Sequence, residues 1–428
     1  MNKKVKIPYG PKELYFELPT DNIIIGSPKN VPSCNLEKEI ILALNNPLGC
    51  NRFDQLIKKE KKIAIVIDDY TRPTPTKEIL TIVLKKLKDL GVNKDSIFII
   101  IATGIHRKMT TDELERKIGN EILNMFKVIQ HNADNIENLT YLGNSSRNTP
   151  IWINKEVLKA DIRIGIGLVE AHPYAGFCGG PKIIMPGIAG KKTIFSHHGH
   201  LAESINSWFG RTKGNPFWED LVEIARVGGL NSVIDVVING EGKVCDVFFG
   251  DPVKAQEEAI KSFIEIYGVR IEQPVDIVIA SGNPKYWYFD QSNVAMLNAS
   301  SVVKEGGTRI IAAYCSEGLG PDIIRKLYLE SFSRTWPTPE QYLKEMKEGL
   351  YNYEMADAPA IYKLLQAEKK AHMILVTEGI TNQDANKMRL DWTRNIQEAV
   401  NKVFSKYGNK ASVLILPLGS MSYAYIKN

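Results

Sequence analysis

Short runs of consecutive apolar residues alternate along this chain with longer stretches in which apolar residues recur every three or four positions. Residues 62–67 and 96–102 have the pattern of buried strands, and residues 76–90 between them have the spacing of an amphipathic helix. A third buried strand is expected at residues 161–167, and a β-hairpin at residues 5–25. Strands that alternate with helices are typical of a parallel sheet, so the first part of the chain is expected to form a doubly wound α/β domain.

A second strand–helix series begins at residues 275–280, and the helical stretch 251–267 that precedes it is expected to connect the two series. Further strands of this series are expected at residues 308–313, 373–377 and 412–418. The pattern therefore predicts an α/β protein with two Rossmann-like domains and mostly parallel sheets. We place the domains at residues 1–268 and 269–428.

Composition agrees with this class. The chain has 428 residues, 44% hydrophobic and 24% charged, which is typical of a soluble protein too long for one ordinary core. Its apolar runs are far shorter than the roughly 18–20 residues that cross a bilayer, and no apolar segment follows the basic N-terminus, so we expect a cytoplasmic protein without a membrane partner. Five cysteines without CxxC spacing disfavour a disulfide framework. The charge of +5 is spread along the chain and does not favour nucleic-acid binding.

Polar residues gather where the predicted strands end. Residues 68–75, 103–107 and 168–173 follow the first three strands and contain carboxylates, histidines and arginines. In open α/β sheets ligands bind beyond the carboxyl ends of the strands. We therefore expect these three segments to form one site.

Each of these residues also has a purely structural interpretation. Residues 68–75 could form a turn and a helix N-cap, or Arg72 could hold an anionic group. His106 could be a solvated loop histidine. His172 precedes a proline, which restricts its backbone and favours a fixed side chain. Histidines at two strand ends suit a reaction with an acid or base on each face of a substrate, as in a racemase, an epimerase or a lyase with a bound cofactor.

Residues 176–190 are rich in glycine and suit a loop whose backbone approaches a ligand closely. Their spacing fits neither a Walker A loop nor GxGxxG. Lys182 in this loop is a candidate for a phosphate contact or for covalent attachment. Residues 197–200 contain three histidines, which could include a metal ligand or could be a polar loop. Carboxylate and cysteine partners at zinc spacing are missing, so an all-protein zinc site is not favoured.

Five motifs in a fixed order resemble the nickel-dependent lactate racemase family, and the resemblance covers nearly the whole chain. They are Asp-Tyr-Thr-Arg-Pro-Thr-Pro at residues 69–75, Thr-Gly-x-His-Arg at 103–107, Glu-x-His-Pro-x-Ala-Gly-Phe-x-Gly-Gly-x-Lys at 170–182, Pro-Gly-Ile-Ala-Gly at 186–190 and a later His-His pair.

The resemblance implies a racemase or epimerase that inverts C2 of a 2-hydroxy acid by proton-coupled hydride transfer. Its cofactor would be a nickel-pincer nucleotide, the Ni(II) complex of pyridinium-3,5-bisthiocarboxylic acid mononucleotide, attached covalently through Lys182. His198 would be the protein ligand of nickel, and His106 and His172 would be the catalytic acid/base pair. Enzymes of cofactor synthesis would be partners during maturation.

The remaining positions carried over from the family would bind the cofactor. They are Asp69, Arg72, Tyr174, Gly179 and Gly180. The resemblance further implies that residues 1–268 form a cofactor-binding catalytic domain. Residues 269–428 would then close over an active site in the interdomain cleft.

The second domain departs from the family at one motif. Relatives carry Tyr-Gln-x-x-Lys where this chain has Val294, Ala295 and Asn298, so a larger 2-hydroxy acid or a sugar-like polyol is as well supported as lactate. The aromatic residues 286–288 could line a substrate pocket or pack structurally. Two other classes remain open: a non-catalytic protein that binds or stores the cofactor, and a zinc or iron hydrolase that uses the histidines of residues 197–200.

Overall fold

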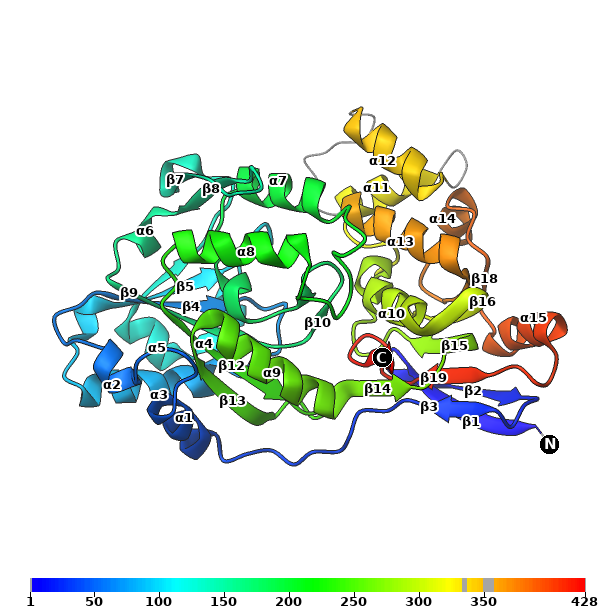
Figure 1. Cartoon of the computed structure of the whole chain (residues 1–428), viewed down its shortest axis with the longest axis horizontal. Helices are drawn as coiled ribbons and strands as arrows, with labels where there is room; N and C mark the ends of the chain where they lie inside the picture. The colour runs from blue at the N-terminus through cyan, green and yellow to red at the C-terminus, as the bar shows by residue number, and fades with distance from the viewer. Residues whose placement is uncertain (1, 333–336, 349–357, 428) are drawn as a thin grey trace. The chain divides into compact units, whose positions relative to one another are not determined.

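The computed structural model describes residues 2–332, 337–348 and 358–427 of the chain. Its contacts divide the chain into two compact units (Figure 1). Unit 2 contains Asn30–Glu170 and Tyr174–Ile266, and unit 1 contains Met1–Lys29, Ala171–Pro173 and Tyr267–Asn428.

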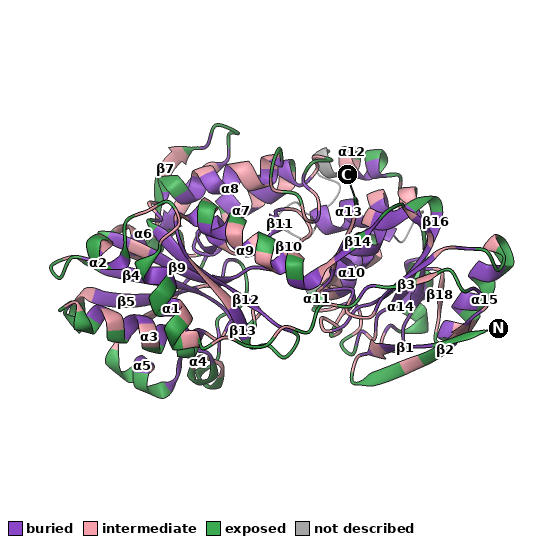
Figure 2. Ribbon diagram, turned by 60° about the horizontal axis from the view of Figure 1, so that its bottom comes forward, coloured by how far each residue is buried: buried purple, intermediate pink, exposed green. Residues whose placement is uncertain are grey.

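Unit 2 is built on a six-stranded sheet. Its strands, in spatial order, are β13 (Val244–Gly250), β12 (Ser232–Ile238), β9 (Ile162–Leu168), β4 (Ile63–Asp68), β5 (Ile97–Ala102) and β6 (Lys127–Gln130). Every neighbouring pair is parallel except β12 with β13. All six residues of β4 are buried (Figure 2), as its unbroken apolar run predicts for a central strand covered on both faces.

Helices and small sheets complete unit 2. The helices are α1 (Leu36–Asn45), α2 (Phe53–Leu56), α3 (Thr76–Asp89), α4 (Thr111–Ile118), α5 (Asn120–Met125), α6 (Lys155–Leu158), α7 (Lys191–Leu201), α8 (Pro216–Val227) and α9 (Pro252–Tyr267). Single 3-10 turns occur at η1 (Lys94–Ser96), η2 (Ile136–Asn138) and η3 (Gly180–Ile183), and β7 (Leu139–Asn144) pairs with β8 (Pro150–Asn154).

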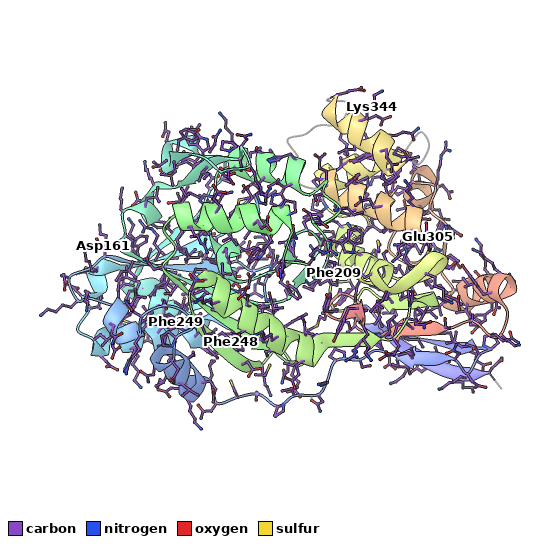
Figure 3. All side chains as sticks on the ribbon, viewed as in Figure 1. Asp161, Phe209, Phe248, Phe249, Glu305 and Lys344 are labelled. Atoms are coloured by element: carbon purple, nitrogen blue, oxygen red, sulfur yellow. The ribbon has the colours of Figure 1, made fainter. Side chains whose placement is uncertain are left out.

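Alternate residues of the central strands face opposite layers of unit 2. Ile164 and Ile166 of β9 join a core cluster with residues of α1, α3 and α4. Gly165 and Gly167, which alternate with these isoleucines, face the opposite side of the sheet. At the far edge, β13 carries the neighbouring aromatic residues Phe248 and Phe249 (Figure 3), of which Phe249 is buried in the same core cluster.

The parallel register aligns the carboxyl ends of the central strands. Asp68, the last residue of β4, pairs with Ala102, the last residue of β5, and Ile67 pairs with Ile166 near the end of β9. At the opposite end of the sheet, the carboxylate of Asp161 accepts a hydrogen bond from the backbone N–H of Lys62 at 2.9 Å (Figure 3). The segments after β4, β5 and β9 therefore emerge at one edge of the sheet.

Unit 1 contains a second six-stranded sheet, and its neighbouring strands all pair in parallel. The order is β18 (Trp392–Thr393), β17 (His372–Val376), β16 (Val303–Ala312), β15 (Val275–Ser281), β19 (Val413–Leu416) and β3 (Ile23–Ile25). Its helices are α10 (Phe289–Val302), α11 (Asp322–Phe332), α12 (Pro339–Lys347), α13 (Ala358–Lys370), α14 (Asn382–Lys387) and α15 (Ile396–Tyr407). Small sheets of unit 1 are formed by β1 (Lys3–Tyr9) with β2 (Lys12–Leu18) and by β14 (Gly268–Ile271) with β20 (Tyr423–Ile426). Of two further short strands, β10 (Ala171–His172) is grouped with unit 1 and β11 (Gly176–Phe177) with unit 2. The predicted α/β class with mostly parallel sheets is confirmed.

The N-terminal segment corrects the predicted domain limits. The expected hairpin forms as β1 and β2, but β3 then pairs with β19 and so extends the sheet of unit 1. The backbone of Gly10 is also held by the side-chain amide of Asn283, at 2.8 and 2.9 Å. The contacts group the first 29 residues with unit 1, which differs from the predicted start of the N-terminal domain at residue 1, and unit 2 starts at Asn30. Unit 2 ends at Ile266, against the predicted boundary after residue 268.

In the described ranges, no helix combines the length and the hydropathy needed to cross a membrane.

Candidate active site

The loop after β4 places Asp69 against His106, which follows β5. The Asp69 carboxylate is buried, and its Oδ2 lies 2.7 Å from Nδ1 of His106. Its Oδ1 accepts hydrogen bonds from the backbone N–H and the hydroxyl of Thr71, at 3.0 and 2.5 Å. Burial acts to raise the pKa of Asp69, but the hydrogen bonds from His106 and Thr71 outweigh it and hold this pKa below its usual value.

The ionised Asp69 fixes the tautomer of His106. A carboxylate only accepts hydrogen bonds, so Nδ1 of His106 carries a proton and Nε2 carries the lone pair of the neutral ring. The His106 side chain is 46% exposed, which leaves the ring accessible to a small molecule. A histidine held in this way by a buried carboxylate can accept and return a proton through its other nitrogen.

Arg72 lies in the same loop, beside a carboxylate that follows β9. Its Nε lies 3.5 Å from Oε1 of Glu170, and both side chains are partly buried. Burial acts to lower the pKa of Arg72, but the nearby Cys178 and Glu170 outweigh it and raise this pKa, so the guanidinium is charged. A partly buried guanidinium at the edge of the sheet can hold an anionic group of a ligand.

A buried ion pair anchors the loop that carries Asp69 and Arg72. Nζ of Lys117, on α4, lies 2.6 Å from Oδ1 of Asp68 and donates a hydrogen bond to the carbonyl of Arg72 at 2.9 Å. The other Asp68 oxygen accepts from the hydroxyl of Thr74. Asp68 and Lys117 therefore hold both ends of the loop.

The Gly-rich segment lies against two glycines of β9 in the sheet of unit 2. A Cβ built on Gly165 would lie 2.7 Å from Cγ2 of Ile183, in η3. A Cβ built on Gly167 would lie 3.7 Å from the Cα of Gly179. These two glycines of β9 allow the backbone of the segment to lie directly on the strand.

Two consecutive glycines then turn the chain into η3. Gly179 and Gly180 have φ angles of +79° and +52°, a left-handed conformation that favours glycine. A Cβ on Gly180 would also lie 2.7 Å from the carbonyl oxygen of Pro252. Lys182, which is partly buried, follows this turn, and its contact with a ligand stays a prediction.

His198 lies on the helix α7. Residues 197–200 therefore do not form the polar loop that was one of their two predicted interpretations. Its Nδ1 lies 2.9 Å from the carbonyl of Ile194, one helical turn earlier. A carbonyl only accepts, so Nδ1 carries the proton and Nε2 carries the lone pair that a metal ion requires. Burial, and then the charge of Lys182, lower the pKa of His198 to about 3, which keeps this ring neutral.

The other two histidines of this cluster have backbone partners. Nε2 of His197 lies 3.0 Å from the carbonyl of Phe217, and the residue is fully buried. Both ring nitrogens of the exposed His200 lie against backbone carbonyls, those of Ser196 and Arg147. Within the part of the chain that the structure describes, no group of three His, Cys, Asp or Glu side chains is arranged to hold a metal ion. His197 and His198 each keep a lone pair on one ring nitrogen, and His198 is the less buried of the two, so its role as a metal ligand stays a prediction.

Tyr174 belongs to the surroundings of His198, whereas His172 belongs to the other unit. The ring of Tyr174 lies 6.3 Å from that of His198, and its carbonyl accepts a hydrogen bond from Asn215 at 2.7 Å. Ala171–Pro173, which include the partly buried His172, are grouped with unit 1. The pairing of His172 with His106 in one reaction stays a prediction.

Three buried side chains that hold the Gly-rich segment were missed at the sequence level. His131 lies between the amide of Asn154, at 3.1 Å, and the carbonyl of Ala189, at 2.9 Å. Asp235 and Gln256 contact the turn at Gly179 and Gly180. All three come from segments distant in the chain. Asp235 is a polar residue in an apolar run, which is a weak local signal, whereas His131 and Gln256 stand among other polar residues and give none.

The substituted motif of the second domain lies on α10. Val294 and Ala295 are buried. Asn298 is fully buried too; its amide nitrogen donates to two carbonyls of residues 419–422 at 2.9 Å each, and its oxygen accepts the N–H of Ala424 at 2.8 Å. This asparagine is committed to holding the C-terminal segment and offers no charge to a ligand.

The aromatic residues before α10 are only partly structural. The rings of Tyr286 and Trp287 stack with their centroids 5.2 Å apart, and Trp287 is 43% exposed. The hydroxyl of Tyr288 accepts a hydrogen bond from Gln291 at 3.1 Å. Tyr288 is thus bonded to the first turn of α10, while a role of the exposed Trp287 in a substrate pocket stays a prediction.

Two family models match the chain. Residues 9–210 match the lactate racemase N-terminal domain, and residues 271–422 match the lactate racemase C-terminal domain.

Individual relatives agree with these matches. The chain is 29% identical over 424 residues to a lactate racemase of Thermoanaerobacterium thermosaccharolyticum, with 97% of each chain covered. It is 28% identical over 382 residues to a lactate racemase of Lactiplantibacillus plantarum, with 88% of each covered.

Solved structures show the same likeness. The lactate racemase apoprotein of T. thermosaccharolyticum superposes with a TM-score of 0.86 and 26% identity, covering 99% of this chain and 100% of that one. A protein from Thermotoga maritima shares the fold, with a TM-score of 0.67 and 18% identity, covering 93% of this chain and 100% of the other.

Proposed function

We propose a specific reaction for this chain, which belongs to the lactate racemase family and is therefore an isomerase of the racemase type. The chain inverts C2 of a 2-hydroxy acid with a nickel-pincer nucleotide that is attached to Lys182. The observation that carries the proposal is the contact between buried Asp69 and accessible His106 at 2.7 Å. This pair lies at the carboxyl edge of the sheet, where α/β enzymes bind their ligands.

The residues of unit 2 fit such a cofactor. His198 is neutral, and its Nε2 lone pair suits a nickel ion. Lys182 is near enough for its charge to lower the pKa of His198, so a group attached to the lysine would lie beside that ring. Gly179 and Gly180 allow close approach of a ligand, and Arg72 is a cation for a phosphate or carboxylate.

When bound, this cofactor supplies a hydride acceptor, which no protein side chain provides. We assign the proton transfers to histidines of the chain. His106 accepts the proton of the C2 hydroxyl through Nε2, while Asp69 holds its Nδ1–H and stabilises the charge that forms on the ring. The hydride would return to the opposite face of C2 as a proton returns to the oxygen of the 2-keto form, which gives the other enantiomer. His172 is proposed as the second acid/base, which serves the opposite enantiomer.

The substrate is proposed as a 2-hydroxy acid, and lactate is the first candidate because the relatives are lactate racemases. The neutral, fully bonded Asn298 favours widening the candidates to larger 2-hydroxy acids and sugar-like polyols. A role limited to storing the cofactor is less well supported, because storage does not require an oriented acid/base pair such as Asp69 with His106.

Racemisation of a labelled substrate tests this function. Cofactor-loaded protein is incubated with one enantiomer of lactate carrying deuterium at C2, and in parallel with a panel of larger chiral 2-hydroxy acids. We expect at least one substrate to become racemic with its C2 deuterium retained, since hydride transfer keeps that atom in the active site. The enantiomers are separated by chiral chromatography, and mass spectrometry measures the deuterium content of each. Loss of deuterium to water would contradict hydride transfer, and no inversion of any substrate would contradict the racemase activity.

A further inference from the structure

A buried carboxylate lies under the turn that precedes Lys182. Asp235 is in the middle of β12, opposite Gly167 of β9, and is 1% exposed. Its Oδ2 accepts a hydrogen bond from the backbone N–H of Gly180 at 2.8 Å. Among the described residues its Oδ1 has no hydrogen-bond partner. A carboxylate on a central strand costs free energy through burial, so its presence here calls for a specific role.

The space around Asp235 is shaped by glycines. A Cβ on Gly167 would lie 3.3 Å from Oδ1, and a Cβ on Gly179 would lie 3.1 Å from the same oxygen and 2.6 Å from Cγ2 of Val169. Any larger residue at Gly179 would push the turn away from the carboxylate. The two glycines and the aspartate therefore form one packed unit.

A buried amide holds the same turn through its carbonyl groups. Nε2 of Gln256, on α9, donates to the carbonyls of Cys178 and Gly179 at 2.9 and 3.1 Å. Its Oε1 accepts from the indole N–H of Trp218 at 3.0 Å, which fixes the orientation of the amide. Gln256 is fully buried.

Lys182 follows this turn with little freedom in its backbone. Its own N–H bonds to the carbonyl of Gly179 at 3.2 Å, within the single turn of η3. The backbone position of the lysine is therefore set by the peptide groups that Asp235 and Gln256 hold.

We propose that Asp235 and Gln256 form a loop clamp, a pair of positioning residues that fixes the Gly179–Gly180 turn and so holds Lys182 for attachment of the cofactor. This inference rests on the proposed attachment at Lys182. The clamp acts through hydrogen bonds: Asp235 accepts from the turn, and Gln256 donates to it. Burial raises the pKa of Asp235 to about 7, so both the charged and the neutral form of this carboxyl group are present near neutral pH. In either form an oxygen of the group can accept the hydrogen bond from Gly180.

Two measurements on purified chains test the loop clamp. The first is trace acetylation of the cofactor-free protein, in which peptide mass spectrometry gives the labelling of Lys182 relative to exposed Lys85. The second is the rate of cofactor attachment, read from the intact mass. Asp235→Leu removes the acceptor, Asp235→Asn keeps an acceptor oxygen, and Gln256→Leu removes the donors. Asp246→Leu, on neighbouring β13, is the matched control because its carboxylate bonds to Ser262 and not to the turn.

In Asp235→Leu and Gln256→Leu the released turn exposes the lysine, so its relative labelling is expected to rise about three- to tenfold. Attachment of the cofactor is expected to slow by about tenfold or more, since small displacements of a reacting group cost large factors in rate. Asp235→Asn is expected to stay within about threefold of the wild type in both measurements, because a neutral acceptor replaces a charged one at small cost. Asp246→Leu should match the wild type.

Unchanged labelling of Lys182 in both leucine variants would overturn the clamp, and so would an Asp235→Asn variant as impaired as Asp235→Leu. If Asp235→Leu does not fold, Gln256→Leu and Asp235→Asn still decide the question. A wild-type chain that never takes up the cofactor would contradict the proposed function instead, and the labelling of the cofactor-free chains would then decide the clamp alone.

Discussion

Replacing Asp69 with asparagine is expected to lower kcat for racemisation by roughly 10²–10⁴-fold, the range that a positioned acid/base contributes. The amide is isosteric with the carboxylate, so the loop keeps its shape. Its NH₂ group, however, can donate to Nδ1 of His106, which would then leave the proton on Nε2, where the substrate proton must be accepted. The amide also carries no charge to stabilise a protonated ring. KM is expected to change little, because Asp69 is buried and acts through the histidine.

A matched aspartate–histidine pair outside the candidate site provides the control. Asp391 and His372 in unit 1 are also 2.7 Å apart. Asp391→Asn should leave kcat unchanged. Steady-state kinetics in both directions, with the extent of cofactor attachment measured in parallel, separates the two variants. An Asp69→Asn enzyme with normal attachment and a kcat within about threefold of the wild type would remove the proposed acid/base role of the pair.

Replacing Lys117 with methionine is expected to destabilise unit 2 by roughly 3–5 kcal/mol, because removal of one partner leaves a buried charge unpaired. The side chains of Lys117 and Asp68 are 8% and 12% exposed, and their charged atoms are 2.6 Å apart. Burial raises the pKa of Asp68 in spite of the opposing effects of Lys117 and Thr74. Without the lysine, the carboxyl group would be protonated or the loop would open. Activity should fall as well, since the same ammonium group holds the carbonyl of Arg72.

Urea unfolding of purified chains measures this effect. Lys85→Met, which breaks an exposed ion pair with Glu37, is the control and should cost no more than about 1 kcal/mol. The double variant Asp68→Asn with Lys117→Met removes both charges and should recover part of the loss. If Lys117→Met unfolds at the same urea concentration as Lys85→Met, the buried pair does not anchor the loop.

The position of the Asp69–His106 pair could be predicted from the sequence because local rules suffice for it. The apolar runs that became β4 and β5 are not interrupted by polar residues, β9 has one such interruption at Arg163, and parallel strands bring their carboxyl ends to one edge. The motif at residues 103–107 follows β5 directly, so His106 could be placed beside the loop of β4.

Long-range pairings could not be predicted in this way. β3 is an apolar stretch of three residues, and nothing near it indicates that its partner is β19, almost 400 residues later in the chain. For this reason the predicted first domain included the N-terminal segment, which the contacts group with unit 1. Asp235 shows the same limit, since one aspartate in an apolar strand looks like an exposed edge position until the Gly180 N–H is seen against it.

Lys117 and His198 show how burial changes the meaning of a polar residue. Lys117 lies in the last turn of a short, highly charged helix and has the pattern of a solvated side chain, yet it is buried against Asp68 and the carbonyls of the loop. The sequence indicated a metal ligand among three histidines. Both ring nitrogens of His200 lie against carbonyls, whereas His197 and His198 each have one nitrogen against a carbonyl and a lone pair on the other. His197 is fully buried and His198 is 8% exposed, so a ligand can more readily reach His198.

The most direct test of the central claim is the intact mass and nickel content of the chain after co-expression with the enzymes of cofactor synthesis. We predict a covalent mass increase that peptide mapping places on Lys182 and that Lys182→Arg abolishes. Nickel should accompany it at about one ion per chain and should be lost in His198→Ala. A chain that racemises its substrate with an unmodified Lys182 and without nickel would contradict this account.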